Sequence, residues 1–448
     1  MLKPGLCSAA ILALFAFVVS SFAYAQTKYD PGANDTEIKI GQTMPFSGPA
    51  SAYATIGKVE AAYFRMINDH GGINGRKINL IAYDDGYNPA KTVEEVRKLV
   101  EGDEVLFTFQ TLGTPPNAAV QKYLNTKKVP QLFAATGANR FTDPKSFPWT
   151  MGLNPSYQTE GRIYARFILD NYPNAKIGVL YQNDDLGKDY LVGLRGGLGA
   201  KAAAMIIDES PYEVTDPTVD SQISRMKTLG VDLLVDITTP KFAAQAIKKI
   251  AELGWRPVHI LDVNATSVGE VMAAAGADNS KNIISVHYVK DPLDPTWKDD
   301  PGMRKWLAFM DKYYPGGDKT SGFNAYGYSA AQLLTLVLLQ CGNDLTRENV
   351  MRQAANLKDV TLDLTLPGTS ISTSPADYRV FKQVRMMRFT GERWEEFGPI
   401  LTDDSKSGVD GGGNTRGDGQ KIAAMRTRRS SRLRIGPISF GQARAPSS

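Results

Sequence analysis

Cysteine and histidine are scarce in this 448-residue sequence, which contains two Cys and three His. The histidines, at positions 70, 259 and 287, are isolated, and no group of residues has metal-ligand spacing. Cys7 lies in the N-terminal segment, so Cys341 alone remains in the body, where it cannot form an internal disulfide. Cys341 ends an apolar run without a basic neighbour, and we expect a buried helix residue rather than a reactive thiol.

Long hydrophobic runs are also lacking, except for one at residues 11–19. Lys3 precedes this run and Ala23-Tyr24-Ala25 follows it, in the A-x-A form of a signal-peptidase site. The run is well short of the ~20 residues of a spanning helix. We therefore expect residues 1–25 to be a signal peptide, cleaved near Ala25/Gln26, and the product to be exported to the periplasm in soluble form. A membrane anchor is the alternative.

A basic body is lacking too, although the formal net charge is +4. Residues 403–448 contain nine Lys and Arg against four Asp, which leaves the rest of the mature chain slightly negative. A nucleic-acid surface is therefore not implied. The 403–448 segment is rich in Gly, Arg and Ser without periodicity, and we interpret it as a disordered basic tail. A functional basic arm and an out-of-frame extension are the alternatives.

Motifs of catalysis and cofactor binding do not follow any expected strand. G-x-G-x-x-G, the P-loop pattern and the G-x-S-x-G elbow are all missing. Pairs of adjacent Asp occur at 84–85, 184–185 and 299–300, and solvated loops or helix caps explain them. We expect no cofactor, no metal and no enzymatic activity. A hydrolase or transferase on an α/β scaffold is the alternative from another class.

Strand and helix patterns alternate almost without interruption through residues 26–402. The first series starts with a strand at 37–44 and a helix at 54–69, and the second starts with a helix at 157–170. Short apolar strands linked by helices are typical of parallel sheets covered on both faces. This length suits two domains. The sequence therefore predicts an α/β protein with two lobes of similar architecture.

Loops rich in small and hydroxyl residues follow three strands of the first series: "PFSGPASAY", "TLGTPPNAA" and "AATGANRF". The carboxyl ends of parallel strands meet at the edge where such sheets bind ligands. Hydroxyls and amides at helix N-termini satisfy a carboxylate without a counter-charge. One such loop is equally typical of a capped turn. Three loops at one edge predict a site for a small anion.

The segment "IKIGQTMPFSGPASAYATIGKVEAAYFRMINDHGGINGRKINLIAYDDGYNPAKTVEEVRKLV" resembles the start of the branched-chain amino acid (leucine) binding proteins of ABC importers, which are type I periplasmic binding proteins. Its specific elements are the turn Ser47-Gly48-Pro49, the turn from Asn68 to Gly75, and Asp84-Asp85. The likeness continues through "VPQLFAATGA", "KIGVLYQNDDLGKDY" and "GVDLLVDITTPKFAAQAIKKIAELGW" and covers nearly all of residues 36–400.

The resemblance implies two Rossmann-like lobes with parallel sheets, joined by a three-segment hinge. The crossings are expected near residues 153–156, 284–288 and 365–370. Lobe 1 would comprise 36–154 and 286–366, and lobe 2 would comprise 155–285 and 367–400. A monomer would close on a ligand held between the lobes. Inner-membrane ABC permease subunits would then recognise the closed form.

The resemblance also assigns ligand contacts by position. Tyr53 would pack on the ligand. Thr114 and Thr136 would hold its carboxylate through hydroxyls and amides, while Ala134, with Ala135 next to it, offers a backbone carbonyl. In the second lobe Leu186 and Thr239 stand where the family has aromatic residues.

The acidic partner of a ligand ammonium would fall near Val263, one position after Asp262. A one-residue slip on a strand turns a side chain to the other face, so Asp262 replaces that partner only if the register shifts. An ammonium buried without a partner would be costly. The ligand is therefore an amino acid or, as the alternative, an aromatic or other non-amino carboxylic acid. A sensor or regulator on this fold would need a DNA-binding or spanning segment, and none is predicted.

Overall fold

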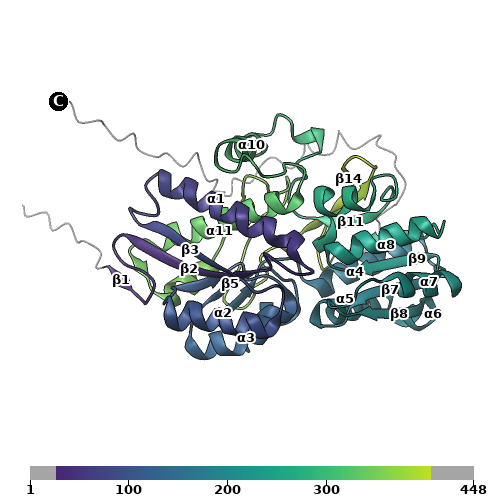
Figure 1. Ribbon diagram of the computed structural model, residues 1–448, viewed down its shortest axis with the longest axis horizontal. Helices are drawn as coiled ribbons and strands as arrows, with labels where there is room; N and C mark the ends of the chain where they lie inside the picture. Colours follow the sequence, from purple (N-terminus) through teal and green to yellow (C-terminus); the bar gives the residue numbers. More distant parts are fainter. Residues whose placement is uncertain (1–26, 405–448) are drawn as a thin grey trace, which may run out of the picture.

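The computed structural model describes residues 27–404, which form two α/β lobes lying side by side (Figure 1). The predicted signal peptide and the segment after residue 404 lie outside the described residues. Each lobe has its own sheet, covered by helices on both faces, which confirms the predicted fold class. Within residues 27–404, no helix combines the length and hydropathy that crossing a bilayer would require.

The first lobe is built on a five-stranded parallel sheet in the order β3-β2-β4-β5-β6. Its strands are β2 (Glu37–Met44), β3 (Lys77–Asp84), β4 (Phe107–Phe109), β5 (Gln131–Ala134) and β6 (Thr150–Gly152). β2 has the limits expected for the strand at 37–44. Its inward side chains are buried without interruption, which gave the strand a clear pattern in the sequence. The edge strand β6 was not expected. It is only three residues long, too short for a periodic pattern.

Helices cover this sheet in pairs, with α1 and α11 packed together on one face and α2 and α3 on the other (Figure 1). Their limits are α1 (Ala54–Asp69), α2 (Pro89–Arg97), α3 (Thr114–Lys127) and α11 (Gly322–Cys341). Beside them lie α10 (Pro301–Tyr313), α12 (Arg347–Ala354) and the parallel pair β1 (Lys28–Tyr29) and β12 (Asp344–Leu345). Cys341 is buried at the end of α11, as expected, and burial raises the pKa of its thiol to about 12.

The second lobe is built on a seven-stranded sheet in the order β14-β13-β11-β10-β9-β7-β8. Its parallel strands are β7 (Ile177–Gln182), β8 (Ile206–Tyr212), β9 (Leu233–Ile237), β10 (Val258–Leu261) and β11 (Ile284–His287). An antiparallel hairpin, β13 (Val384–Phe389) and β14 (Trp394–Leu401), extends this sheet at one edge. The sheet is therefore mixed, whereas the sequence predicted parallel sheets. A hairpin needs only the turn after Phe389, while a further parallel strand would need a crossover helix.

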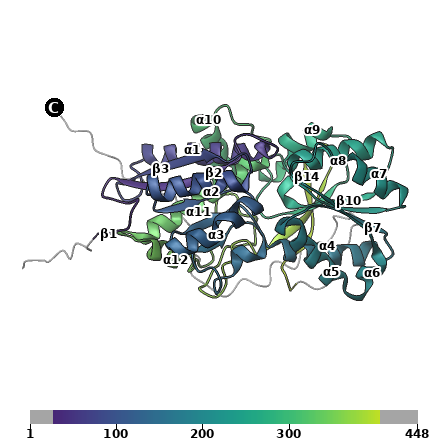
Figure 2. The same cartoon turned by 60° about the horizontal axis from the view of Figure 1, so that its bottom comes forward.

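Helices α4 and α5 cover one face of this sheet, and α7 and α8 cover the other (Figure 2). The helices of this lobe are α4 (Tyr157–Asn171), α5 (Asp185–Leu198), α6 (Ala202–Met205), α7 (Asp220–Thr228), α8 (Pro240–Glu252) and α9 (Ala273–Ala275). Glycines let α4 and α5 approach closely. A Cβ at Gly193 would lie 2.2 Å from the Gln158 carbonyl oxygen, and one at Gly197 would lie 2.5 Å from Ala165 Cβ. The Gly-rich run of α5 thus serves packing, not phosphate binding.

Three passages of the chain connect the lobes. The first runs from β6 to α4, and the second follows β11, near the expected positions. The third lies later than the expected 365–370. Thr373 Oγ1 still donates to the Ala354 carbonyl (2.6 Å) and Tyr378 Oη to the Pro148 carbonyl (3.2 Å) of the first lobe, and β13 begins at Val384.

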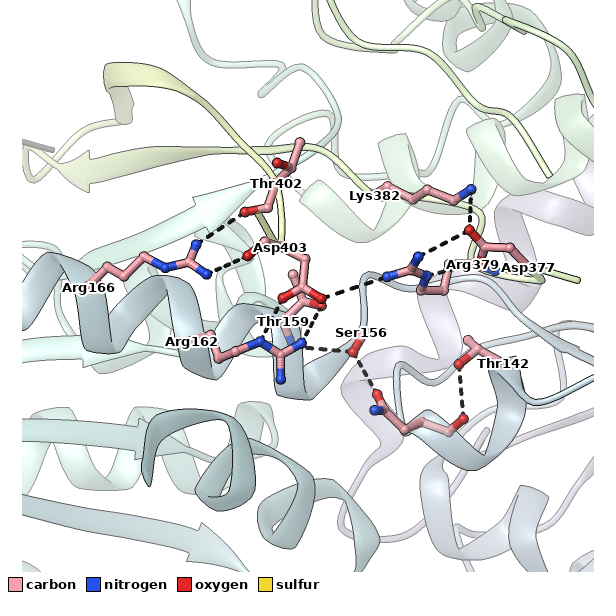
Figure 3. A network of polar contacts seen from close by, with 11 residues as sticks. Thr142, Ser156, Thr159, Arg162, Arg166, Asp377, Arg379, Lys382, Thr402 and Asp403 are labelled. Atoms are coloured by element: carbon pink, nitrogen blue, oxygen red, sulfur yellow. Dashed lines mark hydrogen bonds and ion pairs between the residues drawn. The ribbon is translucent and has the colours of Figure 1, made fainter. Parts of the chain in front are cut away.

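Polar contacts hold Thr402 and Asp403, near the end of the described chain, beside the third passage (Figure 3). Arg162 of α4 donates from Nε to Asp403 Oδ1 at 2.6 Å, and Arg379 Nη1 lies 3.8 Å from Asp403 Oδ2. Arg166 donates to the Asp403 carbonyl as well. We expected the tail to begin at residue 403, but these contacts place Asp403 in the folded body.

Candidate functional site

A cavity opens between the two lobes, with about 950 Å³ of empty space when the part open to solvent is counted. Both lobes line it, and the passages between them contribute Asn154 and Tyr288. Tyrosine dominates the lining, together with Leu112, Phe323 and Trp394. A largely aromatic and apolar lining with a few polar groups is typical of small-molecule sites.

Five of the predicted ligand contacts line this cavity: Tyr53, Thr114, Ala135, Leu186 and Thr239. The other three, Ala134, Thr136 and Asp262, are buried beside it and are not part of its lining. The structure therefore brings the predicted set together, but it divides the set into residues that face the cavity and residues that support them.

Thr114 is the first residue of α3 and presents its hydroxyl at the carboxyl edge of the first sheet. The helix starts after Gly113, whose φ of +100° and whose approach to the Tyr87 ring leave no room for a side chain. Pro115 and Pro116 follow, and neither has a backbone N–H. The N-terminus of α3 thus offers fewer amide donors to an anion than the sequence interpretation assumed.

Thr136 supports Thr114 from behind. The two hydroxyl oxygens lie 2.8 Å apart, and the Ala138 amide donates to Thr136 Oγ1 at 3.2 Å. The Thr136 amide donates to the Ala134 carbonyl (2.8 Å), which also accepts from the Leu153 amide (3.0 Å). Because the Thr136 amide and the Ala134 carbonyl are already paired, the hydroxyls remain as the polar groups that this edge presents.

Tyr53 spans the gap between the lobes. It lies in a short 3-10 turn before α1, its ring centroid is 5.1 Å from that of Phe323, and its hydroxyl donates to the Asn264 carbonyl (3.1 Å) of the second lobe. Burial, and then the charge of Asp262, raise the pKa of Tyr53 well above its usual value. Tyr53 therefore remains a protonated donor on the cavity wall.

The second-lobe wall is shaped by Leu186 and Thr239. The Leu186 amide does not donate into the cavity, because it donates to Oδ1 of Asp184, the N-cap of α5, at 2.8 Å. The Thr239 amide donates to Tyr212 Oη at 3.0 Å, and the two hydroxyls lie 3.4 Å apart. The cavity thus meets an aliphatic side chain and a small hydroxyl on this side.

Asp262 is 1% exposed, and its carboxylate is fully engaged inside the second lobe. Oδ2 accepts from the Thr238 amide (2.9 Å), and Oδ1 accepts from the Asn264 amide (2.9 Å) and from Asn264 Nδ2 (2.7 Å). Burial, and then the charge of Glu160, raise the pKa of Asp262 well above its usual range. A partner for a ligand ammonium should be ionised and accessible. The raised pKa disfavours the ionised form of Asp262, and its burial keeps the carboxylate away from the cavity.

Glu160 is a buried acid that the sequence interpretation missed. It accepts from Tyr164 Oη (2.6 Å), Tyr190 Oη (2.7 Å) and the Val263 amide (2.9 Å), and burial raises its pKa to about 7. Glu160 lies three residues after Tyr157 and four before Tyr164, on the apolar face of α4. This helical spacing was the sequence signal that could have identified it as a buried acid. Its role depends on residues far away in the sequence, which no local pattern reveals.

Asn154, also missed, joins the lobes at the first passage. Its Oδ1 accepts from Tyr326 Oη (2.7 Å) of α11, and its Nδ2 donates to Asn264 Oδ1 (3.0 Å) of the second lobe. All three residues line the cavity. One side chain in the hinge therefore connects both walls of the site.

The charged side chains of the lining are already paired. Lys290 Nζ lies 2.7 Å from Asp300 Oδ1, and Asp291 accepts from the amides of Leu293 (3.1 Å) and Trp394 (3.2 Å). His287 Nε2 lies 3.2 Å from Glu396 Oε1, but the two atoms do not form a hydrogen bond. Among residues 27–404, no group of His, Cys, Asp or Glu is arranged to hold a metal ion. The site is thus suited to binding through neutral donors.

Comparison with known proteins decides the family. Residues 37–393 match the family model of the periplasmic binding proteins. The chain belongs to this family. It is similar to Leu/Ile/Val-binding protein homolog 1 of Brucella abortus, with 25% identity over 349 residues that cover 75% of this chain and 87% of the relative. Members of this family bind solutes.

Solved structures show the same fold as this periplasmic binding protein. One is a branched-chain amino acid ABC transporter protein from Thermus thermophilus with bound valine, with TM-score 0.73 and 17% identity, covering 83% of this chain and 97% of that one. Another is an ABC transporter solute-binding protein from Rhodopseudomonas palustris BisB5 in complex with 3,4-dihydroxybenzoic acid, with TM-score 0.68 and 18% identity, covering 84% and 99%.

Proposed function

We propose that this protein is the exported substrate-binding protein of an ABC importer. It closes its two lobes on a small carboxylic acid and delivers that acid to permease subunits in the inner membrane, without catalysis. The observation that carries the proposal is the cavity between the lobes, in which hydroxyl groups of the first lobe face an aromatic and apolar lining whose charged side chains are already paired.

Within this function, an aromatic or other non-amino acid is the ligand that the site favours. A carboxylate finds donors at Thr114 and its neighbours, whereas an ammonium finds Asp262 buried and bound to three donors. The complex of the Rhodopseudomonas palustris protein with 3,4-dihydroxybenzoic acid is consistent with such a ligand. An aromatic ring would also find stacking partners among the tyrosines of the lining.

An amino acid is the second candidate. The similarity to the Brucella abortus protein and the valine complex of the Thermus thermophilus protein favour it. In that case Asp262 would have to release one of its donors and reach the cavity.

A thermal-shift screen of aromatic acids, aliphatic acids and amino acids tests the proposal, followed by calorimetry of the compounds that stabilise the protein. We expect aromatic acids to raise the melting temperature and amino acids to leave it unchanged. Stabilisation by branched-chain amino acids alone would select the second candidate. Turnover of esters or amides at a rate abolished by heat would instead revive the hydrolase alternative.

A further inference from the structure

Tyr157 lies where the two lobes meet and lines the cavity. It is the first residue of α4, so it belongs to the second-lobe end of the first passage. The residue is only 2% exposed, and its ring stacks on that of Tyr190, with centroids 4.8 Å apart and planes inclined by 20°. This stacking fixes the direction in which the phenol points.

The hydroxyl of Tyr157 reaches the hydroxyl-rich edge of the first lobe. Burial raises the pKa of Tyr157, and the nearby Gly137 amide and the Thr136 and Thr114 hydroxyls oppose that rise. The Tyr157 amide donates in turn to the Gly137 carbonyl at 3.0 Å. A Cβ at Gly137 would lie 2.1 Å from the Pro155 carbonyl oxygen and 2.7 Å from the Tyr157 ring, so only glycine permits this contact.

Three hydroxyls thus lie close together at this edge. The Ala138 amide donates to Thr136 Oγ1 at 3.2 Å, so this oxygen is already held. A hydroxyl carries one donor proton, which a carboxylate in the cavity would accept. Of the three, Thr114 and Tyr157 line the cavity and Thr136 does not.

This edge offers few other donors to an anion. Pro115 and Pro116 have no N–H, and the Thr136 amide is paired with the Ala134 carbonyl. A carboxylate held here would therefore depend on hydroxyl donors more than at an ordinary helix N-terminus. A phenol is a stronger hydrogen-bond donor than an aliphatic hydroxyl, which makes Tyr157 the principal candidate.

We propose that Tyr157 is a specificity-determining binding residue, whose hydroxyl donates to the acid group of the ligand beside Thr114 Oγ1 while Thr136 positions both hydroxyls. The inference rests on the proposed function and deepens it, because it identifies the group of the ligand that is recognised. Thr114 belongs to the first lobe and Tyr157 to α4, so an acid bound between them links the lobes directly. Recognition needs a carboxylate and makes no use of an ammonium.

The test is calorimetry of Tyr157→Phe with benzoate, phenylacetate and 3,4-dihydroxybenzoate as probes. Tyr157→Phe keeps the ring and its stacking, so we expect a native melting curve and a loss of acid affinity of about tenfold or more. Tyr212→Phe is the matched control. It removes a buried tyrosine hydroxyl of the second lobe that lies outside the lining, bonded to Gln182 and Thr239, and should change acid affinity by less than about threefold.

The outcomes separate this inference from the proposed function. If no probe binds the unmodified protein, the ligand class of the proposed function fails and the inference fails with it. If a probe binds and Tyr157→Phe binds it equally, or loses no more than Tyr212→Phe, only the inference is overturned. If Tyr157→Phe does not fold, 3-fluorotyrosine at position 157 replaces it, and a ¹⁹F signal that stays unmoved at probe saturation overturns the inference.

Discussion

The two walls of the cavity differ in the chemistry that stands behind them. The first-lobe wall presents the Thr114 hydroxyl, supported from behind by that of Thr136, and both are neutral donors. Behind the second-lobe wall lie Glu160 and Asp262, which are buried acids held by tyrosine hydroxyls and amides. One wall therefore offers protons to an anion, whereas the acids of the other wall do not reach the cavity. A ligand is therefore oriented by its acid end.

The largest expected effect is a dependence of stability on pH caused by Glu160, because burial disfavours the charged form of its carboxyl group. The pKa of Glu160 rises from 4.5 to about 7 on folding. The protonated carboxyl therefore contributes stability that is fully present below pH 4.5 and is lost as the pH rises to 7. The loss amounts to about 3 kcal/mol. Urea unfolding should therefore show Glu160→Gln gaining about 3 kcal/mol relative to wild type between pH 4.5 and pH 7.

Glu94→Gln, on the exposed face of α2, is the control for this experiment. A stability difference between Glu160→Gln and wild type that is the same at every pH would contradict the account of the second-lobe wall.

The next effect concerns Asp262 and separates stability from binding. Asp262→Asn leaves one acceptor oxygen for three donors, and we expect a loss of about 2 kcal/mol in the free energy of unfolding. Because the Asp262 carboxylate does not line the cavity, affinity for an aromatic acid should change by less than about threefold. Calorimetry that shows the substitution abolishing binding would restore Asp262 as a ligand contact.

A smaller effect compares the two threonines of the first-lobe wall. Thr114→Val removes a hydroxyl that faces the cavity, and Thr136→Val removes one that lies behind it. We expect Thr114→Val to weaken acid binding by about 2 kcal/mol and Thr136→Val by about 1 kcal/mol. The variants are matched controls for each other. The reverse order in calorimetry would show that Thr136 makes the direct contact.

The fold was largely predictable because its signals are local. The strand at 37–44 and the helix at 54–69 follow from patterns of apolar residues along the chain. The third passage was placed too early, since residues 371–381 have no regular element and are held by single contacts such as that of Tyr378 with Pro148. The resemblance proposed eight ligand contacts, and five of these residues line the cavity.

The remaining part of the site could not be predicted, because it depends on contacts between distant segments. Tyr157 reaches Thr114 only through the turn at Gly137, and Asn154 joins Tyr326 to Asn264 across the hinge. Pro115 and Pro116 are an exception. Their missing N–H groups were visible in the sequence and already argued against a site made of helix amides.

Closure of the lobes on the acid is the central claim, and small-angle X-ray scattering measures it most directly. The contacts of Tyr53 with Asn264 and of Asn154 with both walls describe a closed arrangement. We predict that the free protein samples a more open one and that a saturating acid ligand lowers the radius of gyration. Identical scattering with and without a ligand that calorimetry shows to be bound would contradict the clamp.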